Sequence, residues 1–372
     1  MTLPMTDQAV AQRVLDHIEK GTTDRGAEVW REPVENYRSP ARFDAEMRVL
    51  RRSTMAFCPS SALPEKGSYI ARETAGIPVV VVRGQDGVVR GFRNACRHRG
   101  MQLAEGSGCA NAFMCRYHGW TYALDGSLKH IPHQDGFPGV DKAAHGLVPI
   151  SVVERLGVVF VSIEAPIDET AFETLPELIA GDQRLYAAGE RDIEANWKIF
   201  LEGFLEGYHI RSTHPETFLP YGFDNLTLLE TLGRNSRITF PFKRIKKLTD
   251  IPAADRSVMG YVTYVYHLFP NALLTILSSH TNLVVLEPIS IEKTRFVSYA
   301  MTNAGLGGGE EALAAAKRDA DFVGNTGAAE DRAVVAAIQK GMAANANTHF
   351  TFGHFESLIV HFHKNLRAAL AG

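Results

Sequence analysis

The distribution of apolar and polar residues divides the chain into three parts. Residues 1–42 begin with an amphipathic helical pattern over Met1–Lys20 and then become irregular, with prolines as breakers. From 43 to 164 the pattern changes to short β runs separated by turns. The clearest of these runs are Ile77–Arg83, which leads into a Gly-rich turn, and Arg155–Ile163. We therefore expect residues 43–164 to form a small all-β domain.

Residues 165–372 show a different pattern, in which strand-like runs are followed by helical segments. Charged residues at helical spacing predict a helix over 195–211. Strand-like runs follow at 226–242, 259–268, 271–278, 282–289 and 294–303. Helical periodicity then predicts helices at 309–323, 329–342 and 354–370. Antiparallel strands with long helices against one face make an α+β domain.

The composition restricts where the protein works and what it binds. A chain of 372 residues with 45% hydrophobic residues is long enough for two domains, and its net charge of −3 gives no reason to expect nucleic acid or an anionic membrane as a partner. No apolar stretch is long enough for a transmembrane helix, and the N-terminus lacks the apolar core of a signal peptide. Cys58 and Cys109 are expected to be free thiols, which indicates a reducing cytoplasm.

Two mixed cysteine–histidine pairs carry the strongest chemical signal. Cys96 and His98 form the first pair, and Cys115 and His118 form the second after an interval of sixteen residues. Such pairs can hold a [2Fe-2S] cluster with both thiolates on one iron and both imidazoles on the other, which raises the reduction potential. A structural zinc site is the alternative, since zinc also binds two cysteines and two histidines. Zinc fingers, however, usually group the cysteines together and the histidines together.

The residues around these pairs are also informative. Gly100 and Gly119 allow the backbone to approach a cluster, so that amide groups can hydrogen-bond its sulfur atoms. Arg97, Arg99 and Arg116 are either solvated surface residues or a docking site for an acidic electron donor. With these flanks the two segments resemble the Rieske loops of the aromatic-ring-hydroxylating oxygenase family.

A second candidate metal site lies near residue 200. Glu206 and His209 are three residues apart and would project from one face of the predicted helix, while His214 stands just before Pro215, where that helix is expected to end. Two histidines and a carboxylate suit mononuclear non-haem iron(II) and leave positions open for oxygen and substrate. The alternative is that both histidines are ordinary surface or core residues.

The segment from Asn196 to His214 resembles the catalytic helix of Rieske non-haem iron oxygenase α subunits. On this resemblance Asn196 is assigned to the catalytic site with Glu206. The resemblance also implies an acidic third iron ligand at the head of a later helix, where we expect Asp331 and keep Glu330 as the alternative. Without the family pattern, both acids would be simple helix N-terminal charges.

The resemblance further implies a role for Glu206 between subunits. In the family this position bridges a Rieske histidine of one subunit to an iron-ligand histidine of its neighbour, so Glu206 is expected to link His98 or His118 of one chain to His209 or His214 of another. A competing interpretation makes Glu206 itself the carboxylate ligand. Several ring dioxygenases have Asp where this chain has Glu, which favours a monooxygenase or demethylase.

The resemblance gives the remaining expectations for fold and function. It implies an N-terminal helical segment (1–42) that packs on the catalytic domain, a Rieske domain (43–164), and a helix-grip (START-like) catalytic domain (165–372) with a mononuclear iron. The expected function is the terminal oxygenase of a multicomponent system that hydroxylates or demethylates a small organic substrate with O2. The alternatives are a ring cis-dihydroxylating dioxygenase of aromatic hydrocarbon catabolism and a Rieske electron carrier with a small-molecule-binding domain.

The resemblance also implies partners. Family members form trimers or pairs of trimers, so a homo-oligomer is expected. The chain has no Gly-rich dinucleotide fingerprint after a strand, so NAD(P)H is expected to act through a separate reductase, with or without a ferredoxin. Candidate pocket residues, each with core packing as the alternative, are Phe204, Tyr221, Phe223, His280, Asn282 and Phe352.

Overall fold

The computed structural model describes residues 3–372 and divides the chain into two compact units. The smaller unit is Leu50–Asp168, and the larger unit combines the N-terminal segment up to Val49 with Glu169–Gly372. The boundary expected at residue 43 falls inside helix α3 (Pro40–Arg52). The pattern marks Pro40 as a breaker, but proline is favoured at the first position of a helix, and it begins α3 here.

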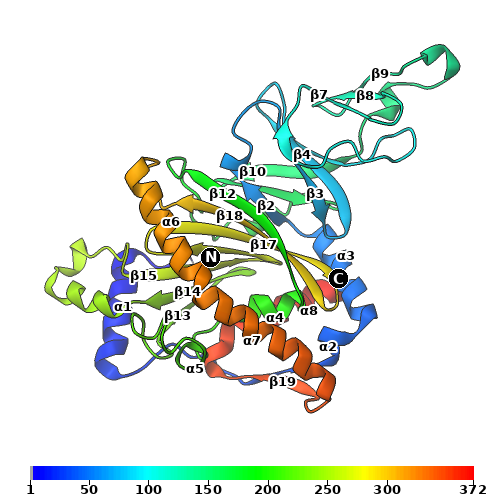
Figure 1. The fold of residues 1–372 in the computed structure, drawn as a ribbon. Helices are drawn as coiled ribbons and strands as arrows, with labels where there is room; N and C mark the ends of the chain where they lie inside the picture. Colours follow the sequence, from blue (N-terminus) through cyan, green and yellow to red (C-terminus); the bar gives the residue numbers. More distant parts are fainter. Residues whose placement is uncertain (1–2) are drawn as a thin grey trace. The chain divides into compact units, whose positions relative to one another are not determined.

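The smaller unit is built from antiparallel strands, as expected for an all-β domain (Figure 1). Its main sheet has the order β2-β11-β10-β5-β4-β3-β6, and a second sheet has the order β7-β8-β9. The strands are β2 (Met55–Pro59), β3 (Ser68–Thr74), β4 (Ile77–Arg83), β5 (Val89–Arg93), β6 (Gly106–Cys109), β7 (Ala112–Met114), β8 (Thr121–Ala123), β9 (Leu128–His130), β10 (Pro149–Arg155) and β11 (Val158–Ser162). The predicted strand at Arg155–Ile163 is therefore the end of β10 and all of β11, joined by a tight turn.

The larger unit contains a seven-stranded antiparallel sheet with the order β12-β18-β17-β16-β15-β14-β13. Its strands are β12 (Leu185–Ile193), β13 (Leu228–Leu232), β14 (Asn235–Pro241), β15 (Val262–Leu268), β16 (Ala272–Ile276), β17 (His280–Ser290) and β18 (Lys293–Thr302). A separate ribbon pairs β1 (Trp30–Pro33) with β19 (His349–Phe352). The predicted run 226–242 is a hairpin that turns at Gly233. The edge strand β12 was not predicted, because most of its positions are exposed and no apolar alternation marks it.

Helices of the larger unit pack on the sheet and on one another. Figure 1 shows α6 and α7 following one another across one face of the sheet. The helices are α1 (Asp7–Lys20), α2 (Glu35–Arg38), α3 (Pro40–Arg52), α4 (Trp197–Glu202), α5 (Ile210–Thr213), α6 (Glu310–Asn325), α7 (Gly327–Gly341) and α8 (Ser357–Ala371). No helix within residues 3–372 has both the length and the hydropathy needed to cross a bilayer.

The continuous helix predicted over 195–211 is wrong. The segment forms two short helices, α4 and α5, joined by an irregular stretch that contains Gly203 and Gly207. A Cβ atom at Gly207 would lie 2.7 Å from the Thr227 side chain and 3.3 Å from the Phe240 ring of β14, so the glycine permits a close approach to this part of the unit. Glu206 consequently lies in this stretch rather than on a helix face.

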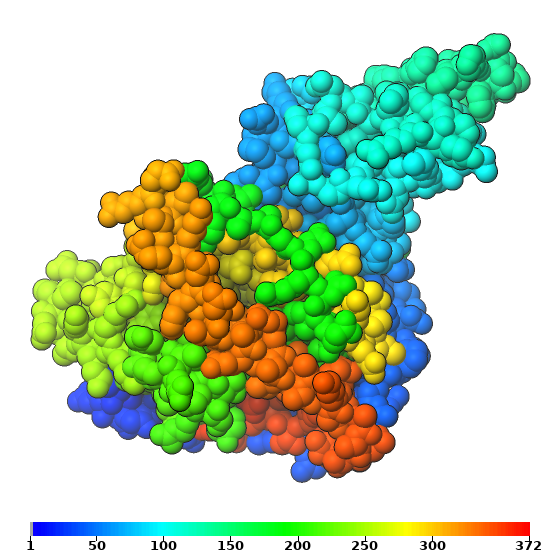
Figure 2. All heavy atoms as spheres, in the orientation of Figure 1, coloured from blue at the N-terminus to red at the C-terminus, as the bar shows by residue number. Residues whose placement is uncertain are grey.

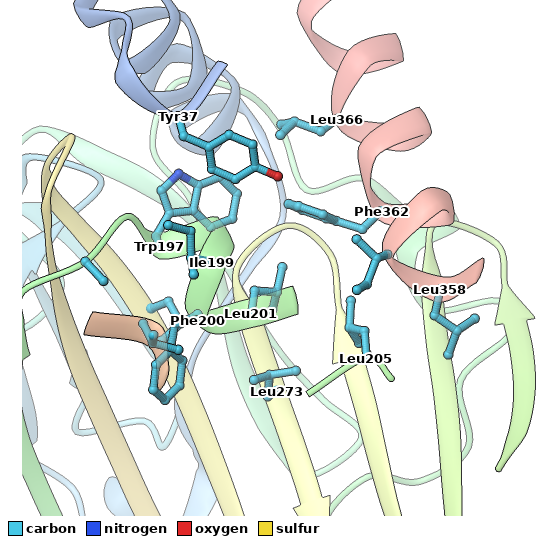
Figure 3. Packing of buried hydrophobic residues seen from close by; sticks show 14 of the residues in the cluster. Tyr37, Trp197, Ile199, Phe200, Leu201, Leu205, Leu273, Leu358, Phe362 and Leu366 are labelled. Atoms are coloured by element: carbon cyan, nitrogen blue, oxygen red, sulfur yellow. The ribbon is translucent and has the colours of Figure 1, made fainter. Parts of the chain in front are cut away.

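Aromatic packing fixes α4 in the core of the larger unit. Trp197 is fully buried and meets Phe362 of α8 edge to face, with ring centroids 5.6 Å apart (Figure 3). Burial of each such side chain contributes about 1.5–3 kcal/mol. The next residue, Lys198, reaches Glu46 of α3 at 2.7 Å, and both side chains are buried. The start of the segment that carries Glu206 and His209 is therefore held rigidly.

Candidate functional site

The two cysteine–histidine loops of the smaller unit have the same backbone geometry. The amide of Gly100 donates to the Cys96 carbonyl at 2.9 Å, and the amide of Gly119 donates to the Cys115 carbonyl at 2.9 Å. Both glycines have positive φ, 76° and 75°, which favours a residue without a Cβ. Each cysteine amide also donates to the carbonyl oxygen five residues further on. The loops are thus two copies of one turn.

The side chains of these loops form a donor set that suits a [2Fe-2S] cluster. Cys96 and Cys115 are buried, whereas His98 is half-buried and His118 is exposed, and the two imidazole centroids lie 4.7 Å apart. Burial, followed by the neighbouring His118, lowers the pKa of His98 and favours the neutral imidazole that binds iron. The histidine end is the more exposed end of the site.

Tyr122 is a residue of this site that sequence analysis did not single out. Its buried hydroxyl lies 3.3 Å from the Cys96 sulfur and accepts a hydrogen bond from the Arg97 amide at 2.9 Å. Burial, and then the contact with Cys96, raises the pKa of Tyr122, so the hydroxyl keeps its proton. A proton donated to a cluster sulfur raises the reduction potential.

Three exposed arginines surround the loops. Arg97 donates to the Gly146 carbonyl at 2.8 Å, and Arg99 donates to the Tyr117 hydroxyl at 3.0 Å. Arg97, Arg99 and Arg116 form no ion pair with any carboxylate of residues 3–372. Solvated surface and docking of an acidic donor both remain compatible with this arrangement.

In the larger unit the structure brings together His209, His214 and Asp331. One ligand atom from each lies within 4.8 Å of the others. Asp331 Oδ1 is 2.9 Å from His214 Nε2 and 3.8 Å from His209 Nε2. His209 and His214 flank the short helix α5, and Asp331 lies near the start of α7. This is a two-histidine, one-carboxylate set of the kind that holds non-haem iron(II).

Outer carboxylates hold the far side of each imidazole. Glu206 Oε1 contacts His209 Nδ1, and Glu330 Oε2 lies 2.6 Å from His214 Nδ1. Both Nε2 atoms are thereby directed toward Asp331, as in carboxylate–histidine–metal arrangements. Glu330, the alternative ligand, and Glu206, the competing ligand, therefore both lie on the side of a histidine away from the shared space.

Two observations show that a cation fits this space. His214 Nε2 is buried and has no hydrogen-bond partner within residues 3–372, although Asp331 Oδ1 is only 2.9 Å away. Burial opposes a charge on either imidazole, yet the neighbouring carboxylates outweigh it and raise the pKa of His209 and His214. A bound divalent cation would satisfy the same negative field and displace those protons.

Asn196 does not lie at the metal site. Its side chain accepts from the Lys198 amide at 3.1 Å as the N-cap of α4 and donates to the carbonyls of Tyr37 and Ile291. These hydrogen bonds use both the oxygen and the nitrogen of the Asn196 side chain. Asn196 therefore caps and positions α4, and this role replaces its catalytic assignment.

A cavity of about 660 Å³ opens beside the three ligands, and His209, His214 and Asp331 form part of its wall. Its floor is one face of the sheet, because the strand register aligns alternate residues: Phe240 pairs with Thr263, Thr275 with Asn282, and Asn282 with Ala300. Helices α6 and α7 cover it from the other side. In Figure 2 the surface is hollowed between these helices and β12.

Five of the six predicted pocket residues line this cavity: Phe204, Tyr221, Phe223, His280 and Asn282. Phe352 does not line it. That residue lies in β19, is buried and stacks on His363 with centroids 5.7 Å apart. It lines a second cavity of about 330 Å³, whose wall also includes His209 and Asp331, so a pocket role for Phe352 stays a prediction. Sequence analysis did not identify several other lining residues: Arg191, Phe218, Phe240, Phe242, Asp319, Phe322 and Arg332.

Comparison with known proteins identifies both units. Residues 53–147 match the Rieske [2Fe-2S] domain, and residues 182–372 match the ring hydroxylating alpha subunit (catalytic domain). The chain belongs to the ring-hydroxylating α-subunit family. The family therefore accounts for a Rieske cluster in one unit and a mononuclear iron in the other.

Curated relatives are oxygenase subunits of monooxygenases. The carnitine monooxygenase oxygenase subunit of Acinetobacter pittii is 35% identical over 200 residues, which cover 50% of this chain and 53% of the relative. The glycine betaine monooxygenase oxygenase subunit of Chromohalobacter salexigens is 36% identical over 188 residues, which cover 48% and 42%. The matched part thus spans about half the length of these relatives.

Solved structures share the fold over nearly the whole chain. A quaternary ammonium Rieske monooxygenase in complex with an inhibitor superposes with a TM-score of 0.78 at 23% identity, covering 99% of each chain. Naphthalene 1,2-dioxygenase from Rhodococcus sp. superposes with a TM-score of 0.77 at 18% identity, covering 98% of each chain. At these identities the likeness establishes the fold and not the substrate.

Proposed function

We propose that the protein is the terminal oxygenase of a multicomponent Rieske system that hydroxylates or demethylates a small organic substrate. The observation that carries this proposal is the triad of His209, His214 and Asp331 in the wall of a largely apolar cavity. A pure electron carrier has no use for such a triad beside a cavity. The names of the curated relatives, which are carnitine, glycine betaine and choline monooxygenases, favour monooxygenation of a quaternary amine or a related compound.

The protein's own residues would hold and orient the reactants. When bound, the mononuclear iron supplies oxygen activation and the Rieske cluster supplies single electrons. His209, His214 and Asp331 would hold the iron from one side and leave its other positions facing the cavity. Glu206 and Glu330 fix the imidazole orientations and keep a proton on each Nδ1.

The cavity wall would hold the substrate and exclude water. Aromatic side chains dominate one part of it, and the Tyr221 and Phe322 rings meet edge to face with centroids 6.0 Å apart. Such rings bind apolar groups and also attract a quaternary ammonium through their faces. Asp319, which accepts from His280 at 3.0 Å and from the Ser279 amide, adds a negative charge to the lining.

The proposal includes partners and a location. Electrons would come from NAD(P)H through a separate reductase, with or without a ferredoxin, and the exposed arginines around the cluster loops offer a surface for an acidic donor. We further propose a homotrimer or a pair of trimers, with Glu206 linking the cluster of one chain to the iron of its neighbour. A cytoplasmic location is supported by the four free cysteines, two of which belong to the cluster loops.

A single turnover without the reductase tests the proposal. The iron-loaded protein is reduced chemically and mixed with labelled oxygen and a panel of quaternary amines, methoxyarenes and aromatic acids. Formaldehyde release would indicate demethylation, one labelled oxygen in the product would indicate monohydroxylation, and two would indicate dihydroxylation. The Asp331→Ala protein is the control and should keep its cluster but form no product. A cluster that stays reduced in oxygen with every compound, in protein with about three irons per chain, would contradict the proposal.

A further inference from the structure

Two arginines of the cavity wall have no acidic partner. Arg191 comes from the edge strand β12 and Arg332 from helix α7, and both line the cavity. Neither forms an ion pair with any carboxylate in the described part of the chain. Arg332 Nη1 is buried without a hydrogen-bond partner in residues 3–372. A buried guanidinium nitrogen without a hydrogen-bond partner is costly. An acceptor from outside the chain would remove this cost.

Arg191 is exposed at the cavity, where it packs on an aromatic ring that also lines the wall. The Arg191 guanidinium lies over the Phe296 ring, 4.5 Å from its centroid. Burial, and then the charge of Arg332, lowers the pKa of Arg191. The two positive charges repel each other beside a partly apolar wall. A bound anion would reduce this repulsion.

Other cations of the same wall differ from this pair. Arg244 donates to the Gly260 carbonyl at 2.7 Å and to the Ser278 hydroxyl at 2.9 Å. Lys243 donates to the carbonyls of Leu219 and Pro220. Their hydrogen bonds are made within the chain. Arg191, which is exposed, and Arg332, whose Nη1 is buried, have no such hydrogen bonds within residues 3–372.

We propose that Arg191 and Arg332 bind the carboxylate of an organic acid substrate whose body fills the aromatic part of the cavity. This inference rests on the proposed function, because it names the substrate class of the same site. A guanidinium group binds a carboxylate through two parallel hydrogen bonds, which gives orientation as well as affinity. Arg332 directly follows the expected ligand Asp331 in α7, so a carboxylate held there brings the rest of the molecule beside the iron site.

The volume of the cavity suits this class. About 660 Å³ is typical of a small-molecule site and accommodates an acid with an apolar or quaternary-ammonium body. The carboxylate would supply the negative charge that Arg191 and Arg332 lack as a partner. The aromatic rings and Asp319 lie elsewhere in the same wall, where they can take up the body of the molecule.

Binding of matched probes tests the inference without turnover. Isothermal titration of the iron-loaded full chain compares 4-phenylbutanoate with 4-phenylbutanamide, and 4-(trimethylammonio)butanoate with its amide. Each acid should bind roughly tenfold or more tightly than its amide. Arg332→Gln and Arg191→Gln should each reduce this ratio, and the double variant should bring it close to one. Arg332→Lys, which keeps a charge without the planar fork, should lose part of the ratio.

The controls separate this site from general charge effects. Arg184→Gln removes an exposed arginine that is paired with Glu310 and should leave the ratio unchanged. Equal binding of acid and amide, no binding of either, or loss of the ratio in Arg244→Gln instead of the two proposed variants would overturn the inference. Acids that bind tightly but are never oxygenated would overturn the proposed function and leave the carboxylate site standing. Demethylation of a neutral amine by protein that binds neither acid would support the proposed function and overturn the carboxylate site.

Discussion

Asp331 and Glu330 allow a direct test of which carboxylate holds the iron. They are adjacent in α7, carry the same charge and both contact His214, so Asp331→Ala and Glu330→Ala form a matched pair. Their positions relative to the histidines differ. Asp331 faces both histidine Nε2 atoms, whereas Glu330 contacts His214 Nδ1 on the opposite side of the ring. Asp331→Ala should empty the iron site, and Glu330→Ala should only weaken it.

The size of the second effect follows from the role of Glu330. Its oxygen lies 2.6 Å from His214 Nδ1 and also accepts from the Thr217 hydroxyl at 2.7 Å, so it orients the imidazole without contacting the space between the ligands. Loss of such an outer carboxylate typically costs 10- to 100-fold in metal affinity, or about 1.4–2.7 kcal/mol. Loss of Asp331 removes one of three ligands and should exceed about 100-fold.

Anaerobic competition against a chromogenic ferrous chelator measures both affinities. Cluster iron is subtracted by counting inorganic sulfide, so only the mononuclear site is followed. Glu310→Ala, at an exposed acid of α6, should bind iron like the parent protein. The reasoning would be refuted if Glu330→Ala emptied the site while Asp331→Ala retained iron. It would also be refuted if only Glu206→Ala lost iron, since Glu206 would then be the ligand.

Three further changes test packing and electrostatics away from the iron. Gly126→Ala should cost about 1–3 kcal/mol more than Gly87→Ala in thermal unfolding followed by cluster absorbance, because both glycines have positive φ but only at Gly126 would the new methyl group meet an aromatic ring, at 2.4 Å; equal costs would contradict this. Burial lowers the pKa of His267 to about 4, so the unfolded chain binds a proton that the folded chain does not, and stability present above about pH 6.5 is lost as the pH falls toward 4. Urea unfolding at several pH values should show His267→Gln losing about 3 kcal/mol less over this range than the parent, and parallel profiles would refute the assignment. Lys198→Met should lower the free energy of unfolding by about 1–3 kcal/mol in chemical denaturation, because buried Glu46 then keeps only Arg42, at 2.8 Å, as an ion-pair partner, and a loss below about 1 kcal/mol would show that the pair contributes little.

The donor residues of both candidate metal sites could be predicted because their spacing is local. Cys96 with His98, and His209 with His214, are each separated by a few residues, so short loops hold them close whatever the rest of the fold does. Asp331 is different, since more than a hundred residues separate it from His214. Only the family pattern pointed to it, and the fold then placed it 2.9 Å from that histidine.

The errors in secondary structure have physical causes that a one-dimensional pattern does not contain. The expected helix through Glu206 is broken at a stretch that contains Gly203 and Gly207, and Gly207 packs closely against the side chain of Thr227, twenty residues further along the chain. The edge strand β12 follows from pairing with β18 along its length, although its own side chains are mostly exposed. In both cases tertiary contacts override local preference.

The cavity could be predicted only in part for a related reason. Its floor depends on the register of five neighbouring strands, and a shift of one residue in any hairpin would exchange the lining set for the opposite face. Aromatic residues near the metal motif could be guessed from their position, but Phe352, which is equally aromatic, stacks on His363 and lines the second cavity instead of the first. Residue type alone does not separate lining from packing.

Whether a buried polar group has a partner in its own chain gives information about ligand binding that residue type alone does not give. A buried or partly buried cation that has partners in its own chain, such as Lys198 with Glu46, is explained by the fold. Arg332 has no such partner for its buried Nη1. The exposed Arg191 lies in the same cavity wall, on an edge strand that is far from α7 in the sequence. A buried guanidinium nitrogen without a partner is costly, and in a cavity beside a metal triad we infer that a ligand offsets this cost. The metal ligands therefore indicate the reaction class, while the unpaired arginines indicate which molecules can reach it.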